Sequence, residues 1–307
     1  MKNHHYYQIA LSASLSLLLF LTTVKIHAQQ QAFSYNQYAD NLITLNPAYS
    51  LLDKAASINV LGRRQFIGIE GAPATLLFNG SLPIPSINAT VGIAVVNDQF
   101  AIERLTEVNV FFAKAITLNE QTKLGVSLNA GLKNYRANYQ NLDPNDPTFG
   151  TDLRETQPNI GFGIMLYTDK YYVGISVPQL SIQSLGTASV QQATYLQNHY
   201  YMAAAYIFGQ QEDFAIKPAA LASYTKDLPV NLNFSTTIYL KQLLGIGANY
   251  NTNKQLAAML SVHGKKFKIG YSYEFGTGTT SIQGYNNATS ELSLTYRFGN
   301  KISTKML

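Results

Sequence analysis

Hydrophobic and polar residues alternate along most of the chain after residue 55. The segment KKFKIGYSYEF at 265–275 places its aromatic residues and isoleucine on one face. The other face carries Lys266, Lys268, Gly270, Ser272 and Glu274. Successive side chains of a strand point to opposite faces, so this pattern predicts strands with one apolar and one polar face. Turn residues divide the chain into about fourteen such segments. The predicted strands are 56–64, 73–82, 89–97, 105–117, 122–137, 158–167, 171–178, 197–208, 213–224, 230–240, 243–250, 255–263, 265–275 and 290–298.

The lengths of the connections also alternate. Short connections follow the even-numbered strands, whereas the long ones, at 138–157, 179–196 and 276–289, follow odd-numbered strands. Barrels of the bacterial outer membrane have short periplasmic turns and longer outer loops. The alternation therefore predicts an even-numbered barrel whose two termini are periplasmic.

Composition favours the same class. Charged residues are 13% of the chain, and aromatic residues are 12%, as 21 Tyr and 15 Phe without Trp. Soluble domains average about 25% charged residues. A secreted β-sandwich is the alternative, but its buried face is expected to be mainly aliphatic. We therefore predict an all-β fold: a transmembrane antiparallel β-barrel of about 14 strands, with a short N-terminal lumen or periplasmic segment.

The N-terminus has the pattern of a signal peptide. A polar to basic start precedes an apolar run at 9–24, and Ala28 follows. A membrane anchor is the alternative, but the run is short and interrupted by serines. We expect a signal peptide at 1–28, a periplasmic or lumen segment at 29–55, the outer-membrane barrel at 56–298 and a tail at 299–307.

Charge and cysteine content narrow the function classes. Without residues 1–28 the chain has 20 Lys and Arg against 17 Asp and Glu, spread without basic blocks. This weak charge gives no reason to expect nucleic acid as a partner. Cysteine is absent, so no disulfide framework stabilises the exported chain.

Several motifs resemble those of the PorP/SprF family. Gln37-Tyr38 followed by NPAY at 46–49 resembles the family's QY…NPAYAG opening. The block RRQFIG at 63–68 with GAPAT at 71–75 is similar to its R-x-Q-W/F-x-G…GAP-x-T signature. VGISVPQL at 173–180, GYSYE at 270–274 and YRF at 296–298 match further family strands. Ser50, where the family usually has Ala-Gly, and NATS at 287–290 depart from the pattern.

The resemblance implies an outer-membrane component of the type IX secretion system of Bacteroidota-type Gram-negative bacteria. Such proteins support export or surface attachment of cargo, including gliding adhesins. The implied partners are secretion-system proteins of the periplasm and outer membrane, the cargo or its C-terminal domain, and outer-membrane lipid.

Enzyme and cofactor sites are not indicated. His199 and His263 lie in different predicted strands without acidic neighbours at ligand spacing. The segment 143–147, DPNDP, has too few acceptors for calcium, and GTGTTS at 276–281 lacks the lysine of a phosphate loop. We expect no catalytic, metal or cofactor residues. A channel for small or hydrophobic solutes and an outer-membrane lipid hydrolase remain as alternative functions.

The segment YNQYADNLITLNPAYS at 35–50 precedes the first strand and shows neither the helical nor the strand period. We expect it to fold into the lumen from the periplasmic side, with Asn46-Pro47 turning the chain into the first strand; a loose periplasmic leader is the alternative. Lys266, on the polar face of a C-terminal strand, is expected to face the lumen. The possible contacts between segment and lumen are Tyr38, Asn46, Pro47, Tyr49, Lys268, Glu274, Glu291 and Arg297.

Overall fold

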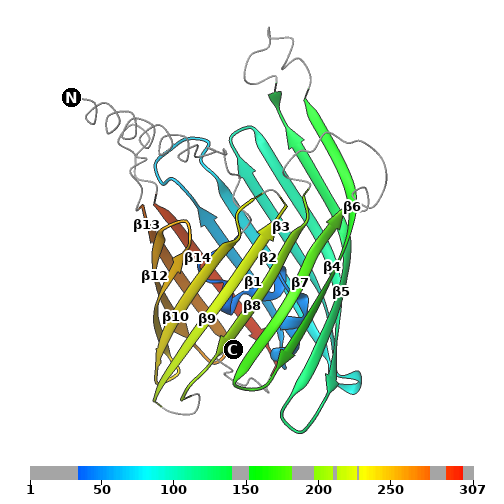
Figure 1. Cartoon of the computed structure of the whole chain (residues 1–307), viewed down its shortest axis with the longest axis vertical. Coiled ribbons are helices and arrows are strands. Elements are labelled where there is room, and N and C mark those ends of the chain that lie inside the picture. The colour runs from blue at the N-terminus through cyan, green and yellow to red at the C-terminus, as the bar shows by residue number, and fades with distance from the viewer. Residues whose placement is uncertain are drawn as a thin grey trace, which may run out of the picture. The chain divides into compact units, whose positions relative to one another are not determined.

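Fourteen strands form one closed antiparallel barrel in the computed structural model (Figure 1). The structure describes residues 34–139, 152–181, 197–209, 213–226, 228–276 and 288–299. Each strand pairs with its sequence neighbours, and β1 closes the ring on β14, with Ala56 opposite Phe298 and Arg64 opposite Ser290. The predicted fold class is confirmed. The strands are β1 Ala56–Arg64, β2 Ala74–Ile84, β3 Ala89–Phe100, β4 Glu103–Thr117, β5 Lys123–Ala137, β6 Leu153–Tyr167, β7 Tyr171–Ser181, β8 His199–Tyr206, β9 Phe214–Thr225, β10 Asn231–Leu240, β11 Leu244–Asn251, β12 Gln255–His263, β13 Phe267–Phe275 and β14 Thr289–Phe298.

Strand β6 differs most from its predicted bounds. It begins at Leu153 rather than at 158, so part of the predicted loop 138–157 belongs to the wall. The residues LRETQ carry no apolar alternation, but the long strand β5 pairs with them as far as Ala137 opposite Leu153. Pro158 is tolerated because the pairing of β6 with β7 ends at Asn159, and proline is confined to strand edges and ends. Lys266 precedes β13 and is exposed, so it does not face the lumen as expected.

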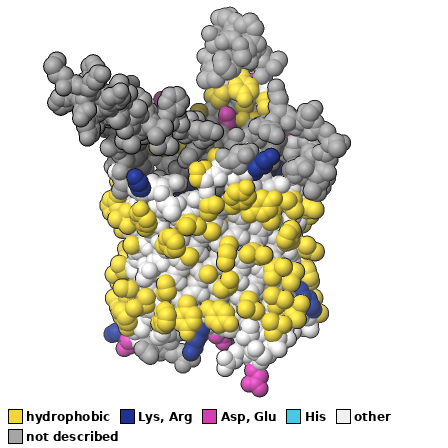
Figure 2. All heavy atoms as spheres, in the orientation of Figure 1, with side chains coloured by type: hydrophobic (Ala, Val, Ile, Leu, Met, Phe, Trp, Pro, Cys, Tyr) yellow, Lys and Arg dark blue, Asp and Glu magenta, His cyan; other side chains and the backbone are white. Residues whose placement is uncertain are grey.

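The strands have an apolar outward face and a mainly polar inward face. On β5, the outward Leu128 and Leu132 are 64% and 56% exposed, whereas the inward Ser127 and Asn129 are buried. Hydrophobic side chains cover the visible side of the barrel wall as a broad belt, with charged side chains toward its two margins (Figure 2). The belt is the lipid-facing surface expected of a transmembrane barrel.

The barrel has two distinct ends. We call the end at which β1 begins and β14 ends the turn mouth, and the opposite end the loop mouth. Connections at the turn mouth are 85–88, 118–122, 168–170, 207–213, 241–243 and 264–266, and those at the loop mouth are 65–73, 101–102, 138–152, 182–198, 226–230, 252–254 and 276–288. The longest connections therefore gather at one mouth.

Residues 34–55 lie inside the barrel, and we call them the lumen plug. They form three short 3-10 helices, η1 Tyr38–Asp40, η2 Leu42–Thr44 and η3 Pro47–Leu52. Another such turn, η4 Pro85–Ile87, lies at the turn mouth. Helix η2 packs on β2 and β3, and η3 packs on β3 to β6. The plug is drawn in blue within the ring of strands in Figure 1. Among the described residues, no helix has the length and apolarity needed to cross a membrane.

Candidate functional site: the plugged lumen

The lumen plug runs along the barrel from the loop mouth to the turn mouth. Ser34 Oγ accepts a hydrogen bond from Asn231, the first residue of β10 at the loop mouth, at 3.4 Å. At the other end, Asp53 pairs with Arg297 beside the last residue of β14. The described chain thus enters the lumen at the loop mouth, which differs from the expected entry from the side of the short turns.

Two carboxylates of the wall hold the upper end of the plug, near the loop mouth. Glu291 of β14 accepts the backbone N–H of Asn36 at 2.9 Å and that of Gln37 at 3.2 Å. The Asn36 amide donates to Glu274 of β13 at 3.1 Å. Arg63 of β1 lies 3.4 Å from Glu291 and supplies a compensating positive charge. The wall provides the charged acceptors here, and the plug binds them through its N–H groups. Asn249 and Ser293 of the wall in turn donate to the side-chain oxygens of Asn36 and Gln37, both at 2.7 Å.

The lower end of the plug, near the turn mouth, reverses this arrangement. The Asp40 carboxylate lies 2.7 Å from the Lys217 ammonium of β9 and 2.6 Å from the Lys268 ammonium of β13. Asp53 lies 2.5 Å from the Arg297 guanidinium of β14. Here the plug supplies the carboxylates and the wall supplies the cations.

The ionisation of the plug follows from these neighbours. Burial alone would raise the pKa of Asp40, but the Lys217 and Lys268 ammonium groups hold that pKa well below its usual range. Burial raises the pKa of the Tyr38 and Tyr49 hydroxyls above the usual tyrosine value. At neutral pH the plug therefore carries a charged Asp40 and neutral tyrosines that donate hydrogen bonds.

Apolar and aromatic contacts fill the space between the two ends. Leu42, Leu45 and Leu52 of the plug are buried in one cluster with wall residues Leu61, Leu77, Val96, Phe111, Met165 and Tyr172. Tyr49 packs edge-on against Tyr172, with ring centroids 5.5 Å apart. The inward face is thus less polar than strand alternation alone predicts, because part of it packs against the plug.

Tyr38 and Asn46 bind backbone and side-chain groups of the wall. The Tyr38 hydroxyl donates to the Asn233 carbonyl at 3.2 Å and accepts from Ser235 Oγ at 3.1 Å. The Asn46 amide donates to the Ile164 and Ile175 carbonyls, both at 3.3 Å. These contacts fix the middle of the plug to β6, β7 and β10.

Asn46 also caps η3, because its Oδ1 accepts the Ala48 N–H at 3.1 Å. Pro47 follows as the first residue of that helix, is buried, and accepts from Ser50 Oγ at 2.8 Å. Asn46-Pro47, expected to turn the chain into the first strand, instead begins η3. The chain first forms η3 and reaches β1 only after Asp53.

Glycines of the wall make room for the plug. A Cβ atom added to Gly163 would lie 2.2 Å from Asn46 Oδ1, and one added to Gly270 would lie 2.2 Å from Gln37 Oε1. Such distances are far below van der Waals contact. Glycine at these inward positions therefore allows plug amides to approach the backbone of the wall.

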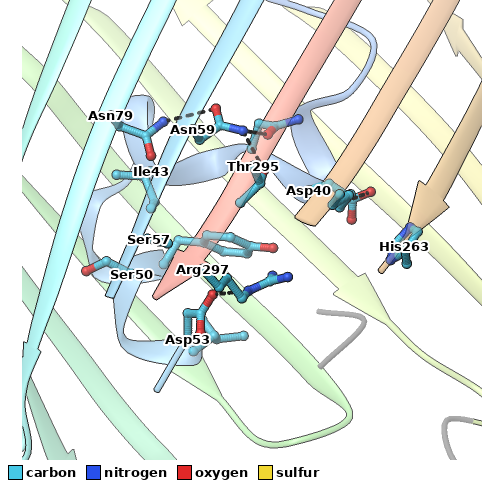
Figure 3. A pocket seen from close by; sticks show the side chains of 14 residues that line it. Asp40, Ile43, Ser50, Asp53, Ser57, Asn59, Asn79, His263, Thr295 and Arg297 are labelled. Carbon is cyan, nitrogen blue, oxygen red and sulfur yellow. Dashed lines mark hydrogen bonds and ion pairs between the residues drawn. The ribbon is translucent and has the colours of Figure 1, made fainter. Parts of the chain in front are cut away.

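Two small cavities lined by described residues lie beside the plug. One, of about 40 Å³, has room for about three water molecules and lies between the plug and β1, β2, β12, β13 and β14. In Figure 3, Asp53 is joined to Arg297 at the edge of this cavity, and Asn79, Asn59 and Thr295 form a hydrogen-bonded row along the wall. The second cavity holds about 20 Å³. Both are too small for a polypeptide segment.

The structure brings all eight sequence-predicted lumen residues into or beside the plug. Tyr38, Asn46, Pro47 and Tyr49 belong to it, and Lys268, Glu274, Glu291 and Arg297 line it. A functional role for these residues stays a prediction.

Sequence reasoning missed Asp40, which joins two lysines, and Lys217, which lies on a strand without any other inward charge. An acid within an otherwise uncharged segment was the available signal for Asp40.

His199 of β8 and His263 of β12 lie on different strands, each beside a hydroxyl group. His199 Nδ1 lies 2.6 Å from Thr225 Oγ1, and His263 Nε2 lies 2.9 Å from Ser261 Oγ. In the part of the chain that the structure describes, no group of three or more His, Cys, Asp or Glu is placed to hold a metal ion. The segment 143–147 and most of 276–281 lie outside the described residues.

Fold and lumen together define a plugged outer-membrane β-barrel. A family model described as "Type IX secretion system membrane protein PorP/SprF" matches residues 27–296. The chain therefore belongs to the PorP/SprF family. A search of curated proteins gives no significant match.

Solved structures of similar shape are outer-membrane barrels. The TodX deltaS2S3 mutant monoaromatic hydrocarbon channel has a TM-score of 0.50 at 10% identity, over 85% of this chain and 95% of that chain. The CymD monoaromatic hydrocarbon channel has a TM-score of 0.49 at 12% identity, over 87% and 94%. Omp33 of Acinetobacter baumannii has a TM-score of 0.47 at 9% identity, over 80% and 99%. At these identities the TodX likeness is a likeness of fold alone.

Proposed function

We propose that this protein supports export or surface attachment of type IX cargo, such as gliding adhesins, from a barrel that its own N-terminal segment keeps closed. Its partners are secretion-system proteins of the periplasm and outer membrane, and the cargo or its C-terminal domain. They bind at the mouths of the barrel, and cargo does not pass through the lumen.

The filled lumen is the observation that carries this proposal. The plug is fixed at both ends by buried charged groups, and the cavities beside it measure about 40 and 20 Å³. Neither cavity has room for a polypeptide segment while the plug is in place. The same feature counts against the alternative of a channel for small or hydrophobic solutes.

Deletion of residues 35–50 tests the closure. The wall satisfies its own backbone hydrogen bonds, so we expect the deletion variant to fold and to conduct ions where the intact protein is closed. Single-channel recordings of both proteins measure this, with K226Q at the loop mouth as a control. If the deletion variant conducts no more than the intact protein, closure by the plug is contradicted.

The proposed role in secretion has a separate test. Loss of the protein is expected to remove cargo from the cell surface while uptake of small nutrients stays normal. Co-purification followed by mass spectrometry is expected to recover secretion-system proteins or cargo. Normal cargo display together with lost solute uptake would favour the channel instead.

We place the loop mouth on the cell surface and the turn mouth in the periplasm, following the lengths of the connections. The end of β14 is then periplasmic, whereas Ser34 lies at the surface mouth, unlike the two periplasmic termini expected from the sequence. Cysteines at Glu70 and Asn253 are then expected to react with an impermeant maleimide on whole cells. Cysteines at Asn119 and Lys170 are expected to react only after the outer membrane is opened. The chain has no cysteine of its own to react, and labelling of Asn119 on whole cells would reverse the orientation.

A further inference from the structure

Three arginines form a row on the outward face of the barrel near the loop mouth. Arg104 of β4 pairs in register with Arg136 of β5, which pairs with Arg154 of β6. All three are exposed. Paired residues on neighbouring strands are about 5 Å apart, so the three Cα atoms fall within about 10 Å.

The uncharged partners of this row do not balance its positive charge. Arg104 donates to Gln99 Oε1 at 2.9 Å and Arg136 to Asn134 Oδ1 at 2.8 Å, and both acceptors are uncharged amides. No carboxylate of the described chain forms an ion pair with any of the three arginines. Like charges on directly opposed strand positions destabilise a sheet. A bound anion would remove this repulsion.

A neutral polar row lies between the arginines and the apolar belt. It consists of Asn97, Thr106, Asn134 and Thr156 in register. Asn97 donates to Thr106 Oγ1 at 2.7 Å, and Asn134 donates to Thr156 Oγ1 at 2.6 Å. The next outward row toward the turn mouth is apolar, with Val95, Val108, Leu132 and Pro158. The outward face therefore changes from apolar to neutral polar to cationic within five residues of strand.

This order matches the layers of one membrane leaflet. From the apolar row to the arginine row, four residues span about 13 Å of strand, or about 10 Å of height at the usual strand tilt. The interfacial layer outside the hydrocarbon core is several ångströms thick. Arginine side chains extend toward such an interface from their attachment points. The guanidinium groups thus lie at the depth of lipid headgroups.

We propose that Arg104, Arg136 and Arg154 bind the phosphorylated headgroup of a glycolipid in the leaflet at the loop mouth. Guanidinium groups bind phosphate oxygens through paired, charge-assisted hydrogen bonds. The row of Asn and Thr below them offers donors and acceptors to the sugar part of the headgroup, and the apolar row contacts its acyl chains. A lipid fits better than an acidic protein, because the patch is continuous with the lipid-facing belt.

Binding of a defined lipid to the purified full-length protein tests this site without depending on secretion. The probes are bisphosphorylated lipid A and the same lipid with both phosphates removed, and native mass spectrometry measures the bound fraction. We expect R136Q/R154Q to weaken binding of the phosphorylated lipid at least tenfold. Removal of both phosphates should weaken binding to the unchanged protein by a similar factor.

The variant K226Q/K254Q is the matched control, because it removes two positive charges from the loop mouth on the other side of the barrel. We expect it to bind the phosphorylated lipid within twofold of the unchanged protein. Heat-modified mobility on gels verifies that every variant is folded. Equal weakening in both double variants, or equal binding of the dephosphorylated lipid, would overturn the proposal. It would also be overturned if R136Q/R154Q kept lipid binding but lost binding of polyglutamate, which would indicate an acidic protein partner.

Discussion

The two ends of the lumen plug are held by opposite arrangements of charge. Near the loop mouth, the carboxylates of Glu274 and Glu291 belong to the wall and the plug offers N–H groups. Near the turn mouth, Asp40 and Asp53 belong to the plug and the wall offers cations. A plug inserted in the reverse direction would place its aspartates beside the wall carboxylates. The charges therefore specify the direction of the plug as well as its position.

The largest expected effect tests the lower end. In D40N, Lys217 and Lys268 stay buried without their shared carboxylate, and breaking a buried pair costs about 3–5 kcal/mol. We expect urea unfolding in detergent, followed by circular dichroism, to show a loss of this order, together with open-channel current. D53N, whose pair with Arg297 is more exposed, should lose clearly less. Equal losses in the two variants would refute the central place of Asp40.

The upper end of the plug is expected to contribute less to the free energy of unfolding than the lower end. E291Q keeps one oxygen acceptor but loses the charge that faces Arg63, and it presents an NH₂ group where backbone N–H groups donate. Hydrogen bonds to charged groups contribute about 1.5–3 kcal/mol, so we expect a loss of that size in the same unfolding measurement. A loss larger than that of D40N would show that the loop-mouth end dominates.

The neutral middle of the plug has a steric test. In G163A, the new methyl group would occupy the place of Asn46 Oδ1, and such overpacking costs about 1–3 kcal/mol. G62A is the control, because nothing lies within 4 Å of a Cβ atom there. The control should stay within about 0.5 kcal/mol of the unchanged protein. Equal stability of the two variants would show that the plug yields readily at Asn46.

The smallest expected effect is that of mild acid. The pKa of Asp40 is lowered in the folded protein, so its stabilising contribution is complete above the ordinary aspartate pKa of about 3.9. That contribution is lost only as the pH falls through the lower pKa of the folded state. The stability that Asp40 contributes, measured as the difference between the unchanged protein and D40N, should therefore stay constant from pH 7.5 to 4.5. A difference that shrinks between these pH values would disprove the assigned charge state of Asp40.

The sequence predicts the wall far better than it predicts the plug. Alternation and turn residues place β1 and β12 at their observed bounds, because a lipid face and a lumen face impose a strict period of two. The start of β6 is not predicted, because its residues do not alternate between apolar and polar and become a strand only by pairing with β5.

The structure of the plug cannot be predicted from the sequence, because its contacts are long-range. The unusual composition of 35–50 indicates a folded segment, but inward charges such as Glu291 and Arg297 are expected of a solvated or salt-bridged lumen as well. The pairing of Asp40 with Lys217 and Lys268 joins residues far apart in the chain, which no local spacing reveals. The loop-mouth position of Ser34 depends on the same long-range contacts.

The path of the plug restricts the order in which the molecule is built. The chain passes through the whole lumen before its first strand begins, so a finished ring could accept it only by threading a charged segment lengthwise. Wrapping the sheet around the segment avoids this step. Strands β13 and β14 are the last strands to be synthesised. They carry Lys268, Glu274, Glu291 and Arg297, which bind the plug, a segment that is synthesised before β1. The N-terminal segment is thus a built-in template, against which the final strands align as they reach β1.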